Sequence, residues 1–180
     1  LDGQNFCATY NVRKDKWGPF GSRHVTVDEN SEQLGDTVSY FLNKGYEDIL
    51  AIKVKQNKGK GGIFNGVDEV TFFFEWYGEN SFAGKHQEGD DMHLPLIDVF
   101  LKKRGYIEPK DFEKIFRPTS IEMPFLCFVG KLTQEEIENI QNLGEVTIRV
   151  HASADNLKAD DPATKTYIDN TNTIIWGTGE

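Results

Sequence analysis

The sequence predicts an α+β fold with a mixed or antiparallel β-sheet of about six strands and three to four helices. Two observations predict it. The expected elements run strands, helix, strands, helices, then strand, helix, strand, with no regular strand–helix alternation. The chain of 180 residues, 38% of them hydrophobic, also suits one core. We therefore expect a single soluble domain over residues 1–180 that contains a β-α-β unit at residues 123–154.

The β-α-β unit is the most clearly patterned part of the chain. Residues 125–129 are apolar, as in a strand that is covered on both faces. Thr133 and Glu136 have the spacing of a capping box, which predicts a helix that ends at Gly144. Residues 145–153 then alternate strictly, so that one strand face carries polar side chains. These side chains are Thr147, Arg149, His151 and Ser153.

The first half of the chain predicts three strands and a helix before a strongly apolar strand. Residues 6–13 and 24–27 are expected to pair as antiparallel strands around an aromatic turn at 17–21. Ser31 is a candidate cap for a helix that Gly45 ends. A third strand is expected over 49–55, then a hairpin loop at 57–62, and a fourth strand over 69–77, which is rich in aromatic residues.

Outside the β-α-β unit, the rest of the chain after residue 77 is expected to form a long polar loop, two helices and two terminal strands. Residues 78–93 are glycine-bearing and acidic, as in a functional or mobile loop. An amphipathic helix is expected over 94–104 and a short one over 111–116, where Pro109 favours a helix start. Possible terminal strands lie at 165–168 and 173–176.

Composition excludes several classes of function. A net charge of −9 argues against general binding to nucleic acids or anionic membranes, because only small local patches could neutralise phosphates. The apolar runs are too short to span a membrane. With only Cys7 and Cys127 and no Cys-x-x-Cys pair, we expect no structural zinc site of the usual kind. We expect no cofactor, and the sequence leaves the compartment and a Cys7–Cys127 disulfide open.

Two His-x-Ser/Thr tetrads are the most specific chemical pattern. His24 and Thr26 form one pair and His151 and Ser153 the other, each pair on one face of an expected strand. Two such strands facing each other could hold a phosphodiester between an acid and a base. The pattern resembles the paired signature of the 2H phosphoesterases. This resemblance implies a metal-independent phosphodiesterase with these four residues as its catalytic groups.

Ordinary structural roles are the competing interpretation of these and other polar motifs. Histidine, serine and threonine are common on half-exposed strand faces, and this interpretation is preferred. Residues 86–93 include several His, Glu and Asp residues, which are types that bind metal ions. Their spacing matches no recognised metal-binding motif, and we expect no metal there. The glycine-rich segment 57–62 lacks the following helix that a phosphate-binding loop needs.

The function expected from the sequence is therefore non-enzymatic. We expect a binding or assembly module for a protein or another macromolecular partner, because no nucleophile motif, dinucleotide loop or metal set is present. Candidate binding residues are Trp17 and Phe20 in the aromatic turn and Arg149 on the last strand of the β-α-β unit. A protein partner is expected, and the oligomeric state is left open.

Overall fold

The computed structural model describes residues 3–22, 25–32, 34–79, 87–130, 149–151 and 173–177. The chain divides into two compact units, Leu1–Met123 (unit 1) and Pro124–Glu180 (unit 2), and each has a β-sheet. Whether they form the single predicted domain stays a prediction. No helix in the described part of the chain is long and apolar enough to cross a membrane.

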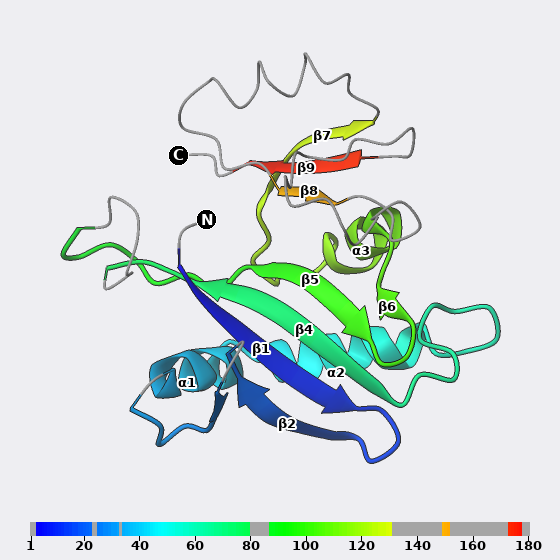
Figure 1. Cartoon of the computed structure of the whole chain (residues 1–180), viewed down its shortest axis with the longest axis horizontal. Helices are drawn as coiled ribbons and strands as arrows, with labels where there is room; N and C mark the ends of the chain where they lie inside the picture. Colours follow the sequence, from blue (N-terminus) through cyan, green and yellow to red (C-terminus); the bar gives the residue numbers. More distant parts are fainter. Residues whose placement is uncertain are drawn as a thin grey trace, which may run out of the picture. The chain divides into compact units, whose positions relative to one another are not determined.

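Unit 1 is built on a six-stranded antiparallel sheet in the order β3-β2-β1-β4-β5-β6 (Figure 1). The strands are β1 (Gln4–Asn11), β2 (Lys16–Gly21), β3 (Thr26–Val27), β4 (Glu69–Trp76), β5 (Leu96–Leu101) and β6 (Gly105–Tyr106). The helices are α1 (Gly35–Asn43), α2 (Tyr46–Gln56) and α3 (Pro109–Phe116). The predicted α+β class is confirmed, as are the strand over 69–77 and the helix over 111–116.

Aromatic rings from all three helices pack against one face of this sheet. Phe41 of α1 is fully buried, with its ring centroid 5.4 to 6.1 Å from five others. These five rings are Phe6, Trp17, Phe20, Tyr46 and Phe74. Phe116 of α3 contacts Phe72 of β4 at 6.0 Å. The core therefore lies between the helices and this face, and its aromatic packing adds to the hydrophobic effect.

The opposite face, which no described helix of unit 1 covers and which we call the helix-free face, carries three rows of side chains that run across the strands. Residues directly opposite each other on paired strands point to the same side. The first row is Lys16, Asn11, Glu69 and Lys102; the second is Thr9, Thr71, Phe100 and Tyr106; the third is Cys7, Phe73 and Asp98. This face is therefore polar at one end and aromatic in its middle.

Residues 49–55, predicted as a strand, form part of helix α2. The buried residues of α2 are Tyr46, Leu50, Ala51 and Val54, which have helical spacing. The alternation of apolar and polar residues over 49–55 suggested a strand because it counted Ile52 as a core residue. Ile52 is 51% exposed and does not belong to the core. The segment 57–62 that follows consequently joins a helix to β4 and is not the loop of a β-hairpin.

Residues 94–104, predicted as a helix, instead form the approach to β5, strand β5 itself and the tight β5–β6 turn. Val99 and Leu101 are buried and alternate with half-buried neighbours, as a strand requires. A register shift opposite Phe73 and Phe74 places Leu96 and Ile97 both in the buried set, which made the pattern look helical.

The predicted aromatic turn at 17–21 is strand β2. Gly18 has φ 108 beside a register shift in the β1–β2 pair, an arrangement typical of a bulge. The strand predicted over 24–27 is the short β3, which pairs with β2 and not with β1. Ser31 does not cap α1, because its hydroxyl accepts from the backbone N–H of Asp28 at 2.9 Å and closes a turn instead.

Unit 2 contains β7 (Phe125–Gly130), β8 (Arg149–His151) and β9 (Thr173–Gly177) in the order β7-β9-β8. Both β7 and β8 pair antiparallel with β9, so they run parallel to each other. Strands therefore occur where the predicted β-α-β unit has them. The helix between them falls in residues 131–148, outside the described residues, as does the strand predicted over 165–168, so the unit itself stays a prediction.

Candidate binding surface

Three segments that carry basic residues lie at one end of the sheet of unit 1 (Figure 1). The basic residues come from the β1–β2 turn and the first residue of β2, from the loop after α2 and from the β5–β6 turn, and all are exposed. We call them the basic end: Arg13, Lys14, Lys16, Lys58, Lys60, Lys102, Lys103 and Arg104. Eight of the chain's 20 Lys and Arg residues thus lie together in an acidic protein.

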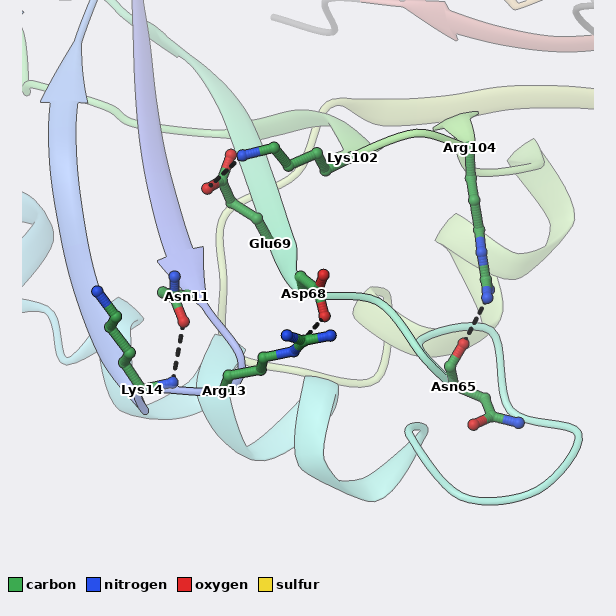
Figure 2. Close-up of polar contacts among 8 residues, drawn as sticks. All are labelled: Asn11, Arg13, Lys14, Asn65, Asp68, Glu69, Lys102 and Arg104. Carbon is green, nitrogen blue, oxygen red and sulfur yellow. Dashed lines mark hydrogen bonds and ion pairs between the residues drawn. The ribbon is translucent and has the colours of Figure 1, made fainter.

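Backbone and side-chain hydrogen bonds hold the three segments against one another. The N–H of Val12 donates to the carbonyl of Asp68 at 2.9 Å, which joins the β1–β2 turn to the start of β4. Arg104 donates to the carbonyls of Asn65 at 2.6 Å and Ile63 at 3.3 Å, which joins the β5–β6 turn to the loop after α2 (Figure 2). The basic end is therefore one surface.

Tight turns present these side chains to solvent. The side-chain oxygen of Asn11 accepts from the backbone N–H of Lys14 at 2.9 Å and closes the β1–β2 turn (Figure 2). Lys103 has a φ of 70° in the β5–β6 turn. This left-handed conformation is uncommon for a lysine and is typical of a tight turn. Both turns project their lysines away from the core.

The three carboxylates of these segments are already engaged in ion pairs. Arg13 contacts Asp68 at 2.6 Å, and Lys102 contacts Glu69 at 3.0 Å (Figure 2). Lys55 of α2 contacts Asp15 at 2.7 Å. Hydrogen bonds from Lys55 and Tyr10, together with the nearby charge of Lys58, lower the pKa of Asp15.

Five lysines of the basic end form no direct ion pair with a carboxylate among the residues that the structure describes. They are Lys14, Lys16, Lys58, Lys60 and Lys103. The eight basic residues of the basic end outnumber the carboxylates Asp15, Asp68 and Glu69 beside them, so positive charge is in excess here although the whole chain is negative. The surface can therefore attract an anionic group, with an affinity that salt weakens.

A second polar cluster surrounds the carboxylate of Glu122 elsewhere in unit 1. Its oxygens accept from the Tyr40 hydroxyl at 2.7 Å and the Leu94 N–H at 3.1 Å, and lie 3.2 Å from His93 Nδ1. The backbone N–H of Glu122 donates to the Tyr46 hydroxyl at 3.1 Å. These contacts join α1, α2, the segment before β5 and the segment after α3, so the cluster stabilises the fold.

The tyrosines of this cluster make the stability of unit 1 sensitive to alkaline pH. Burial raises the pKa of Tyr46 to about 12, and burial together with the Glu122 carboxylate raises the pKa of Tyr40. The folded protein holds protons that the unfolded chain releases from about pH 10. The stabilisation is therefore complete below about pH 10 and is lost as the pH rises toward 12.

We expect unit 1 to lose on the order of 2 kcal/mol of unfolding free energy from Tyr46 alone between about pH 10 and pH 12. Urea unfolding of the full chain, followed by circular dichroism at several pH values, measures this. The loss should be smaller in Tyr46→Phe than in the wild type. An unfolding midpoint that stays constant across this pH range would contradict the assignment.

The residues predicted from the His-x-Ser/Thr tetrads are only partly described. His24 and Ser153 lie outside the described residues, Thr26 is exposed at the start of β3, and His151 ends β8 in unit 2. The two tetrads thus belong to different units. The phosphodiesterase interpretation stays a prediction, and no observation here favours it.

The predicted binding residues Trp17 and Phe20 are half-buried in β2 and face the core. The ring of Trp17 lies 5.0 Å from Tyr10 and 5.4 Å from Phe41, and Phe20 lies 6.1 Å from Phe6. These contacts account for their conformation without a partner. Arg149 begins β8 in unit 2. A binding role for these three residues stays a prediction.

Sequence reasoning missed both the basic end and the Glu122 cluster. The signal for the first was present as three short basic runs around residues 13–16, 58–60 and 102–104. The pairing of β1 with β4 and of β4 with β5 brings them together, and that pairing is not visible in the sequence. Among the described residues, no three His, Cys, Asp or Glu side chains are arranged to hold a metal ion.

Together, fold and surface define an α+β protein whose antiparallel sheet is covered by helices on one face and ends in a basic surface. Comparison of the sequence with known protein families and with curated proteins finds no match.

Proposed function

We propose that this protein is a non-enzymatic binding module that recognises an anionic macromolecular partner through the basic end. The observation that carries the proposal is the group of five exposed lysines that form no direct ion pair among the described residues, supplied by three segments of an acidic chain. Like charges so close together repel one another, which costs stability. A partner that supplies negative charge relieves this repulsion.

The surface suits a polymer better than a small ion. The lysines are exposed on turns and are not gathered around a buried point, so each can contact a different anionic group. The ion pairs Arg13–Asp68 and Lys102–Glu69, and the hydrogen bonds of Arg104, hold the supporting segments in place. Contacts of this kind give affinity that falls steeply with ionic strength.

Heparin, a generic polyanion, tests the proposal. We expect the wild-type chain to bind it, with log K falling linearly against log salt. Lys14→Gln combined with Lys60→Gln should reduce this slope by about one for each lysine that contacts the polyanion. Titrations at several salt concentrations measure the slope.

The matched control is Lys110→Gln combined with Lys114→Gln on α3, which removes the same charge from exposed positions outside the basic end. This variant should bind as the wild type does. No heparin binding by the wild type, or an equal loss in both double variants, would overturn the proposal.

A further inference from the structure

We infer that the anionic partner is a single-stranded nucleic acid whose bases stack on the helix-free face of unit 1 while its phosphates contact the basic end. This inference rests on the proposed function and names the partner class. Three aromatic rings of the helix-free face carry it: Phe73, Phe100 and Tyr106.

The three rings form a continuous aromatic platform. The Tyr106 ring lies 5.2 Å from Phe100 and 5.9 Å from Phe73, measured between centroids. Tyr106 is 57% exposed, although large hydrophobic side chains elsewhere in unit 1 are mostly buried. The Tyr106 ring stands at 74° to the Phe100 ring and at 45° to the Phe73 ring, so the two neighbours flank it on the same sheet face. An exposed aromatic ring held by two neighbours can contact a planar group.

The platform adjoins the basic end. Phe100 of the second row lies two residues before Lys102 of the first row, and Tyr106 in β6 follows the β5–β6 turn that carries Lys103 and Arg104. Lys16 lies in the same first row, farther across the sheet on β2. Neighbouring rows are two residues apart along a strand, about 6.6 Å. A base on the platform therefore leaves its own phosphate within reach of the basic end.

This combination distinguishes nucleic acid from other anionic partners. Proteins that bind single strands combine positive charge along the backbone with aromatic side chains on which bases stack. An acidic peptide or a lipid headgroup would use the lysines but has no planar group for the rings. Duplex DNA hides its base faces, so it too would gain only from the charges. The net charge of −9 argues against general binding and leaves such a local surface possible.

The experiment is fluorescence anisotropy of the full chain with a labelled single-stranded pyrimidine oligonucleotide of about 12 nucleotides. The same strand annealed to its complement and heparin serve as comparison ligands. We expect the single strand to bind more tightly than the duplex. Tyr106→Ala should weaken single-strand binding about fivefold or more without changing its salt dependence.

Variants that remove positive charge should, unlike Tyr106→Ala, change the salt dependence of binding. Lys16→Gln combined with Lys103→Asn should lower the salt slope by up to about 1.4 for a single strand. Asparagine is chosen at position 103 because it tolerates the φ of 70 found there. Tyr106→Phe, which keeps the ring, should bind as the wild type does. Ile52→Ala, which truncates a side chain that is 51% exposed on α2, should also have no effect.

Two results would overturn the inference and leave the proposed function standing: heparin binding retained with the duplex bound as tightly as the single strand, or Tyr106→Ala indistinguishable from Ile52→Ala. If heparin binding itself is absent, the proposed function fails and this inference fails with it.

Discussion

Replacing Phe41 by alanine is expected to lower the free energy of unfolding of unit 1 by about 3 to 5 kcal/mol. Phe41 is fully buried in α1, and its ring contacts side chains from β1, β2, β4 and α2. Truncation removes these contacts and leaves a cavity that five surrounding rings cannot easily fill. Chemical denaturation followed by tryptophan fluorescence, with Trp17 close to the cavity, measures the loss.

Phe41→Leu and Ile52→Ala are the comparisons. Leucine fills part of the cavity, so its cost should fall between the alanine variant and the wild type. Ile52 is 51% exposed, and its truncation should change stability by less than about 0.5 kcal/mol. If Phe41→Ala were as mild as Ile52→Ala, the helices would not cover the sheet face as described.

Replacing Glu122 by alanine is expected to cost about 2 to 3 kcal/mol. The change leaves the Tyr40 hydroxyl and the Leu94 N–H without the carboxylate that accepts their hydrogen bonds. Unmade hydrogen bonds of partly buried groups cost about 1 to 3 kcal/mol, and more where a charged partner is lost. Urea unfolding of the wild type and the variant at neutral pH measures the difference.

Glu113→Ala is the matched control, because it also removes a carboxylate of unit 1. Glu113 contacts Arg117 at 2.9 Å one helical turn away, and its side chain is 15% exposed, so it is at least as buried as Glu122 but has its ion-pair partner within one helix. Ion pairs at this helical spacing contribute about 0.3 to 0.5 kcal/mol. Equal losses in the two variants would show that the contacts of Glu122 stabilise unit 1 no more than an ion pair within one helix does.

The sequence predicts the α+β class because strong β-formers and helix signals stand in an irregular order, and it places β4 and α3 correctly for the same local reasons. Pro109 favours a helix start, and the run from Val70 to Trp76 has high β-propensity. These signals act over a few residues and need no tertiary contact.

Two elements were predicted with the wrong type: α2 was predicted as a strand and β5 as a helix. They show where prediction from local sequence patterns fails. α2 has a weak apolar stripe because Ile52 is apolar and exposed, and β5 has a shifted register that disturbs its alternation. In both, tertiary packing decides the structure. Packing against Phe74 keeps Tyr46 and α2 helical, and pairing with β4 keeps β5 extended.

The binding surface could not be predicted for a related reason. Lys14, Lys60 and Lys103 are far apart in the chain, and each alone is an ordinary solvated lysine. Only the register of β1, β4 and β5 brings their turns to one end of the sheet. The aromatic turn that the sequence suggested for binding faces inward, because Trp17 and Phe20 complete the cluster around Phe41.

Nuclear magnetic resonance of the full chain titrated with a short heparin fragment tests the central claim most directly. Binding at the basic end predicts that the largest backbone amide shift changes fall in residues 12–16, 57–62 and 102–105, and that they shrink as salt is added. Shift changes centred on α3 or on the Glu122 cluster, or none at any salt concentration, would contradict the account.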